Sequence, residues 1–170
     1  SRFAQGILIA DRGGTAPKIP GYEYLELPLH DESNVAGERE LLQSVCDRHR
    51  ADLCISTWHT FPLTTPSLLM VHDMLPEILL GEQRLQHGRW CEKQAAIGHA
   101  AAYLAVSANT AKDLLKFYPD AAAKPLHVMH NGVSRRFGPA GATRIADFRS
   151  KFALSKPYYM FVGPRESYKN

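Results

Sequence analysis

The sequence has few cysteines, and they form no recognisable set. Cys46, Cys54 and Cys91 are odd in number, widely spaced and in no CxxC pair, which argues against a disulfide framework and against a zinc knuckle. A reducing compartment fits this pattern best, so we expect the protein to be cytoplasmic. The eight histidines show no metal-ligand spacing on one element, and we therefore expect no bound metal.

The sequence also lacks runs of one charge and long apolar runs. The net charge is +3, and the 20 Lys and Arg residues are interleaved with the 17 Asp and Glu residues, so a nucleic-acid partner is not expected. The longest apolar stretches have the length of a strand, well short of the ~20 residues that a membrane-spanning helix needs. The start, SRFAQGILIA, does not resemble a signal peptide. It also lacks an initiator Met, and we expect that a front segment is missing.

Three common catalytic motifs are absent. The sequence contains no GxSxG elbow, no Walker A loop and no GxGxxG fingerprint. A hydrolase of the elbow type, a P-loop NTPase and a dinucleotide-binding dehydrogenase therefore have no support. The glycine-rich DRGG stretch at 11–14 is too short to indicate more than a turn.

What the sequence does contain is a regular alternation of strand and helix patterns. Strands are predicted at 6–10, 22–29, 51–57, 66–73, 102–106, 125–133 and 158–162, and helices at 35–50, 87–101, 107–118 and about 143–152. The run from Leu68 to Val71 is fully apolar, as expected for a strand buried on both faces of a parallel sheet. The alternation predicts an α/β fold with a Rossmann-like, doubly wound parallel sheet.

Polar and aromatic residues follow several of these predicted strands. Ligands of a doubly wound sheet bind outside the carboxyl ends of its strands. The residues at those ends are His72 and Asp73, Trp58 and His59, Ser107 and Asn109, and Asn131 and Gly132. They are the candidates for a functional site. Ser107 or Asn109 is also expected to cap the helix that begins there.

Other candidates have structural interpretations too. Asp73 can cap a short helix that is predicted to begin near Leu75. His72 can be an ordinary hydrogen-bonded histidine at a strand end. Asn131 and Gly132 commonly form a tight turn, because both residues tolerate positive φ.

The last residues of the chain carry a different pattern. The apolar run 158–162 is followed by Gly163 and by a loop that contains Arg165 and Lys169. A strand that ends in a glycine and a basic loop usually opens a phosphate-binding unit, because free N–H groups of a following helix are expected there.

Four segments together carry a family resemblance: ADLCISTWHTFPLTTPSLLMVHDMLPEIL, AAYLAVSANTAKDLLKFYP, LHVMHNGVSRRFGP and YYMFVGPRESYKN. In this order and spacing, over about residues 51–170, they resemble the N-terminal half of a family 4 (group 1) retaining glycosyltransferase. The first 50 residues match only in their strand and helix rhythm. The resemblance implies a GT-B architecture, in which two Rossmann-like domains face each other across a cleft. Residues 1–138 would then be the acceptor-side domain, and 139–170 the linker and the first strand and loop of the donor-binding domain.

The resemblance also implies roles for individual residues. His72 matches the catalytic strand-end histidine that faces the donor sugar. Arg165 and Lys169 match the basic pair that binds the donor diphosphate, where two cations stabilise the charge of the leaving group. Asp73, Trp58, His59, Asn131 and Gly132 are then candidate cleft or acceptor residues. The family commonly works without a metal, and the nucleotide sugar is a substrate, so no cofactor is implied.

The implied function is transfer of a sugar from a nucleotide-sugar donor to a glycan or lipid-linked acceptor. Two family features are not found in the chain, namely the glycine-rich loop after the first strand and the paired-glutamate motif of the donor domain, so we expect the chain to be catalytically incomplete. Peripheral contact with the inner membrane face is usual for relatives with lipid-linked acceptors. Two alternatives stay open, a non-catalytic Rossmann-like binding module and another GT-B enzyme such as a sugar epimerase.

Overall fold

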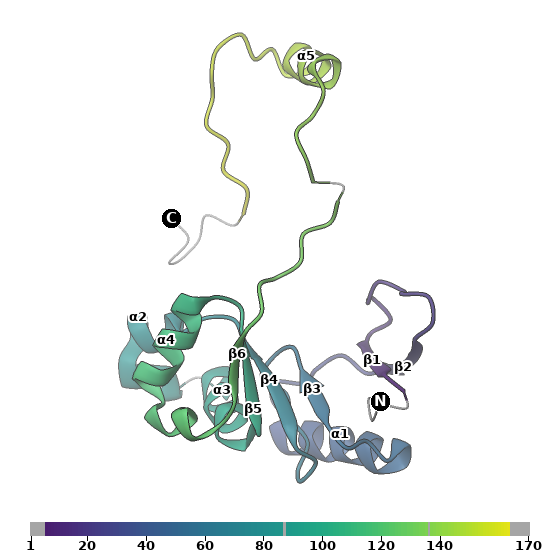
Figure 1. Ribbon diagram of the computed structural model, residues 1–170, viewed down its shortest axis with the longest axis vertical. Helices are drawn as coiled ribbons and strands as arrows, with labels where there is room; N and C mark the ends of the chain where they lie inside the picture. The colour runs from purple at the N-terminus through teal and green to yellow at the C-terminus, as the bar shows by residue number, and fades with distance from the viewer. Residues whose placement is uncertain (1–5, 87, 136, 164–170) are drawn as a thin grey trace. The chain divides into compact units, whose positions relative to one another are not determined.

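A computed structural model describes residues 6–86, 88–135 and 137–163. Contacts within the chain divide it into two units, Ser1–Asn131 and Gly132–Asn170. The first unit contains two parallel sheets with their helices (Figure 1).

The smaller sheet pairs β1 (Leu8–Arg12) with β2 (Glu23–Leu27) in parallel. The predicted glycine turn follows β1, and both of its glycines have positive φ, 70° at Gly13 and 68° at Gly14. A side chain at Gly13 would also approach Leu29 closely, since an added Cβ would lie 2.8 Å from its Cδ2 atom. Positive φ therefore favours glycine at this turn, whereas the close Leu29 atom ends a side chain that is 72% exposed and can move.

The larger sheet contains β3 (Cys54–Ser56), β4 (Ser67–Val71), β5 (Ala102–Ala105) and β6 (Leu126–Val128). The strands are adjacent in this order, and every pair is parallel. The carboxyl ends of all four strands therefore meet at one edge of the sheet (Figure 1).

The helices of the first unit are α1 (Val35–His49), α2 (Leu75–Leu80), α3 (Gly88–His99) and α4 (Ala108–Phe117), with 3-10 turns η1 (Gly81–Gln86) and η2 (Pro119–Ala123). Of the two residues proposed to cap α4, Ser107 does so, because its Oγ accepts from the backbone N–H of Thr110 at 3.0 Å. Asn109 instead donates from its side chain to Asp113 at 2.9 Å.

The core lies between the larger sheet and the helices that cross over it. It is formed by Phe61, Leu69, Val71, Met74, Ala96, Ile97, Ala100, Tyr103, Leu114 and Ala121. In β4 the buried residues alternate with partly exposed Leu68 and Met70, so the prediction that this strand is buried on both faces is wrong. The order β4, β5, β6 advances in one direction, and right-handed crossovers then place α3 and α4 on the same face of the sheet.

The predicted fold class is confirmed at the level of a mixed α/β chain with parallel strands, which is compatible with a Rossmann-like fold. The strands lie in two sheets, however, and the order of the larger sheet does not reverse. Among the described residues there is thus no single doubly wound sheet. Strand periodicity indicates which segments are extended, but it does not indicate which segments pair.

The second unit contains one described helix, α5 (Ala142–Lys151). The strand predicted at 158–162 is wrong, because these residues have no regular structure. These residues are not buried in a sheet, and the side chains of Tyr159 and Val162 are almost fully exposed. Apolar runs become strands only where a neighbouring strand accepts their hydrogen bonds.

Candidate functional site

The carboxyl edge of the larger sheet brings together four of the predicted site residues. Trp58 and His59 follow β3, and His72 and Asp73 follow β4. The turn after β3 is fixed by Ser56, whose hydroxyl donates to the carbonyl of Trp58 at 2.7 Å. Because β3 and β4 pair in parallel, both turns lie at the same edge.

His72 is held at this edge by its ring and by its backbone. Its Nε2 lies 2.9 Å from the carbonyl oxygen of Thr57, and a carbonyl only accepts, so Nε2 carries the proton. The backbone carbonyl of His72 accepts from the hydroxyl of Thr110 at 3.2 Å. The second ring nitrogen, Nδ1, has no hydrogen-bond partner within the described part of the chain. In the neutral ring it is a fixed acceptor.

Aromatic rings lie beside His72. The ring of Trp58 stacks on His59, with centroids 4.5 Å apart and planes 20° apart, and lies tilted 5.8 Å from His72. His59 also meets the edge of Trp90 of α3 at 6.0 Å. Trp58 itself is 44% exposed. The site therefore combines two imidazoles with an indole face that solvent can reach.

His59 is the most strongly perturbed group of this edge. It is 7% exposed, and burial lowers its pKa to about 4, helped by the positive charges of Lys93 and Arg89. Its Nδ1 is buried and has no hydrogen-bond partner among the described residues. His59 is thus a neutral imidazole with an unsatisfied nitrogen.

Asp73 makes a local contact but is not the predicted cap, because the N-cap residue of α2 is Met74 and no side chain of the described residues caps that helix. Its carboxylate accepts from the backbone N–H of Leu75 at 3.0 Å, at the entry to α2. Its backbone carbonyl accepts from the ammonium group of Lys93 at 2.9 Å. The side chain remains exposed at the strand end.

A buried ion pair lies beneath this edge, and the sequence interpretation did not include it. Lys93 of α3 donates to Glu77 of α2 at 2.7 Å, and both residues are 4% exposed. The other carboxylate oxygen of Glu77 accepts from the hydroxyl of Tyr118 at 2.8 Å. One available signal was helical spacing, since Lys93 precedes the buried Ile97 by one turn.

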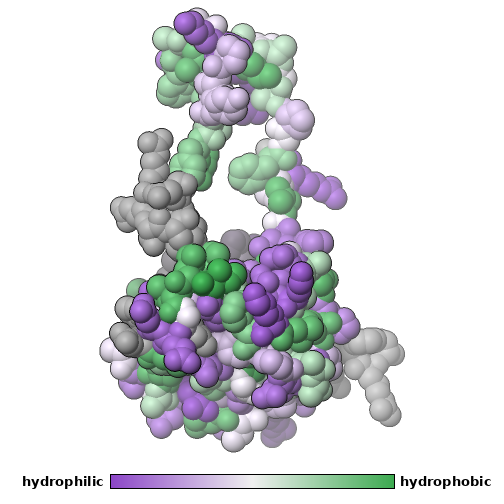
Figure 2. Space-filling model, turned by 90° about the vertical axis from the view of Figure 1, so that its left-hand side faces the viewer, coloured by the Kyte–Doolittle hydropathy of each residue, from purple (hydrophilic) through white to green (hydrophobic). Residues whose placement is uncertain are grey.

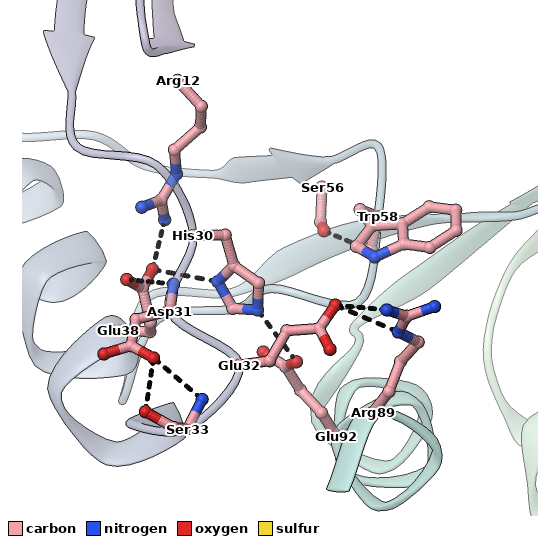
Figure 3. A network of polar contacts seen from close by, with 10 residues as sticks. All are labelled: Arg12, His30, Asp31, Glu32, Ser33, Glu38, Ser56, Trp58, Arg89 and Glu92. Atoms are coloured by element: carbon pink, nitrogen blue, oxygen red, sulfur yellow. Dashed lines mark hydrogen bonds and ion pairs between the residues drawn. The ribbon is translucent and has the colours of Figure 1, made fainter.

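A second polar cluster, also not predicted, lies where the smaller sheet meets α1 and α3 (Figure 3). His30, which follows β2, faces two carboxylates, with Nδ1 3.1 Å from Glu38 and Nε2 3.2 Å from Glu92. Arg12 also reaches Glu38, at 2.7 Å. The burial of Glu38 opposes ionisation, but His30, the backbone N–H of Asp31 and Arg12 outweigh it and lower its pKa. Burial dominates at Glu92 and raises its pKa.

Four further predicted residues are Asn131, Gly132, Arg165 and Lys169. Asn131 is exposed beyond the end of β6, and Gly132 begins the second unit. They form no tight turn, and Gly132 does not have positive φ. Arg165 and Lys169 lie outside the described residues. No cluster of three or more potential metal ligands occurs in the described ranges.

An exposed apolar surface follows the site along the chain. Ile78, Leu79 and Leu80 of α2 are 52%, 55% and 37% exposed. Figure 2 shows the side of the molecule that carries α2 and α4, where hydrophobic and strongly hydrophilic surfaces adjoin. None of the helices that the structure describes has the length and apolar character needed to cross a membrane.

Comparison with family models, with curated proteins and with solved structures finds no match to this chain. The candidate site consequently stands on its own geometry: an anchored His72, a buried neutral His59 and an exposed Trp58 at the carboxyl edge of a parallel sheet.

Proposed function

We propose that this chain is the acceptor-side part of a retaining GT-B glycosyltransferase, which transfers a sugar from a nucleotide-sugar donor to a glycan or lipid-linked acceptor. The observation that carries the proposal is the state of His72. Its position at a strand end is fixed through two bonds, one to its ring and one to its backbone carbonyl, while Nδ1 stays available as an acceptor for a substrate hydroxyl. Preorganisation of this kind is typical of binding and catalytic groups.

The neighbours of His72 support a sugar as the ligand. Trp58 offers a half-exposed indole face beside the histidine, and such a face binds the apolar C–H side of a ring while its polar edge stays solvated. An exposed apolar surface follows on α2, formed by Ile78, Leu79 and Leu80. It favours a lipid-linked acceptor over a free glycan. Arg165 and Lys169 keep their proposed role at the donor diphosphate.

The test uses the intact protein to which this chain belongs. A panel of nucleotide sugars is incubated with it, and release of nucleoside diphosphate is measured. We expect turnover with at least one donor, and we expect His72→Ala to reduce kcat at least about 100-fold, as removal of a single transition-state contact does. The matched control is His127→Ala, because His127 is exposed on β6 and should leave turnover unchanged.

Two results would overturn the proposal. Absence of hydrolysis and transfer with every donor would favour the non-catalytic binding module. Turnover that His72→Ala leaves intact would remove His72 from the active site and would favour another GT-B chemistry with its own catalytic carboxylates.

A further inference from the structure

The pair formed by Trp58 and His59 has a feature that packing alone does not explain. A buried polar atom without a partner costs about 1–3 kcal/mol, and His59 Nδ1 is such an atom among the described residues. Stacking between Trp58 and the imidazole covers one face of the ring, but stacking supplies no hydrogen bond. The unsatisfied nitrogen therefore points to a partner that the described residues do not provide.

Trp58 also has an unused polar group. Within the described part of the chain, its indole N–H donates no hydrogen bond, and its side chain is 44% exposed. Most tryptophans that are well packed use this N–H when they are buried. Trp58 thus offers a ligand one apolar face and one donor, next to the acceptor or donor nitrogen of His59.

The charges around this pair indicate an uncharged ligand. Lys93 and Arg89 are two of the cations that lower the pKa of His59, and each is already paired. Lys93 binds Glu77 at 2.7 Å, and Arg89 binds Glu32 at 2.7 Å. Lys93 is buried in its pair and cannot hold a phosphate or a carboxylate, and the exposed charge of Arg89 is balanced by Glu32, so their presence does not imply an anionic ligand.

We propose that Trp58 and His59 form a subsite for a neutral sugar ring of the acceptor. The C–H face of the ring stacks on Trp58, and one of its hydroxyls bonds to Nδ1 of His59. Nδ1 is buried, so side chains around the imidazole, the stacked Trp58 among them, must move to admit the hydroxyl. This inference rests on the proposed function, because only a transferase has an acceptor. Binding of the sugar can nevertheless be measured without any transfer.

The experiment measures binding of methyl glycosides of neutral hexoses to the intact protein. Saturation-transfer NMR reports contact, and tryptophan emission reports the shift of the indole, because the sequence contains only two tryptophans. Methyl glucuronide serves as the charged comparison. We expect at least one neutral glycoside to bind more tightly than the glucuronide and to change the emission.

Four variants distinguish the two contacts. Trp58→Ala and His59→Gln should each weaken binding about tenfold, which corresponds to about 1.4 kcal/mol. His59→Asn should stay within about threefold, because its amide places a polar atom near Nδ1 whereas that of glutamine lies near Nε2. Trp58→Phe keeps a ring but removes the N–H, and should give an intermediate loss; it also serves if Trp58→Ala does not fold.

The outcomes separate this inference from the proposed function. Equal binding by wild type, Trp58→Ala and His59→Gln, or no glycoside binding at all, overturns the subsite even if donor turnover is present. Variant-sensitive glycoside binding in a protein without donor turnover supports the subsite and overturns the transferase. Preference for the glucuronide overturns the claim that the ligand is uncharged.

Discussion

Two histidines of the first unit follow parallel strands, yet their surroundings differ. His30 comes after β2, and both of its ring nitrogens face buried carboxylates at 3.1 and 3.2 Å (Figure 3). His72 comes after β4, and within the described part of the chain its ring bonds through Nε2 alone, to a backbone carbonyl. His30 thus links the end of β2 to α1 and α3, whereas Nδ1 of His72 has no hydrogen-bond partner among the described residues.

This difference distinguishes a structural cluster from a site for a ligand. In the His30 cluster, charges that are removed from water are placed against opposite charges, which is the condition for burying them. At the His72 edge, Trp58 is exposed, and His59 Nδ1 and His72 Nδ1 have no hydrogen-bond partner among the described residues. Perturbed groups are typical of functional sites, and the two regions differ in access, because Trp58 is 44% exposed whereas Glu38 and Glu92 are 6% and 4% exposed.

The largest expected effect is at the ion pair beneath the site. Lys93→Met leaves the carboxylate of Glu77 buried with only Tyr118 as a donor, and removing one partner of a buried pair costs about 3–5 kcal/mol. We expect this loss in the free energy of unfolding measured with urea. Lys112→Met is the control, since Lys112 is exposed on α4, and it should change stability by less than about 0.5 kcal/mol.

The double variant Lys93→Met, Glu77→Leu refines that result. It removes both charges, so it should recover most of the lost stability. A double variant no more stable than Lys93→Met would show that the unpaired charge of Glu77 is not the source of the lost stability.

The comparison itself is tested by replacing each histidine with leucine. His30→Leu leaves Glu38 and Glu92 buried without the ring between them, and we expect a loss of about 2–3 kcal/mol. His72→Leu removes one bond at a partly exposed edge and should cost less than about 1 kcal/mol. Chemical denaturation of the two variants at pH 7 measures both. Equal losses would contradict the division into cluster and site.

The two leucine variants should also differ in donor turnover and in the pH dependence of stability. His72→Leu should abolish donor turnover, while His30→Leu should retain it wherever the protein is folded. The penalty of His30→Leu should also shrink as the pH falls, because burial already raises the pKa of Glu92 and without His30 this carboxyl takes up a proton more easily. A penalty that grows towards acid would contradict this assignment.

The sequence predicted the type and position of nearly all elements of the first unit, because capping and periodicity are local properties. Ser107 illustrates the local case: a hydroxyl before an amphipathic run predicts a cap, and the cap is present. The terminal apolar run 158–162 illustrates the opposite. Its strand pattern requires a partner elsewhere, and periodicity contains no information about partners.

The candidate site was predictable to the same extent. His72, Asp73, Trp58 and His59 were identified because strand ends of parallel sheets gather at one edge. Glu77 and Lys93 were not, since a buried ion pair between two helices depends on how those helices pack. His30 was missed for the same reason: its partners come from α1 and α3, which are distant in sequence.

A further expected effect concerns His59 and the stability of the first unit in mild acid. The pKa of His59 is lowered from its ordinary value of 6.5 to about 4, chiefly by burial. Below pH 6.5 the unfolded chain binds a proton at this residue, while the folded protein does not until the pH nears 4. The unfolded state is therefore favoured as the pH falls through this window, and the stability is complete only above it.

At pH 5 this linkage should remove ~2 kcal/mol relative to pH 7.5, because each unit of pKa difference corresponds to about 1.36 kcal/mol. Urea denaturation of wild type and of His59→Phe across this range measures it, and the difference between the two curves removes the contribution of Glu92, which has the opposite sign. His127→Phe is the matched control, since an exposed histidine should add no slope. A difference curve that is flat from pH 7.5 to 5 would mean that His59 keeps its ordinary pKa in the folded protein, and the assignment of His59 as a buried imidazole that resists protonation would then be wrong.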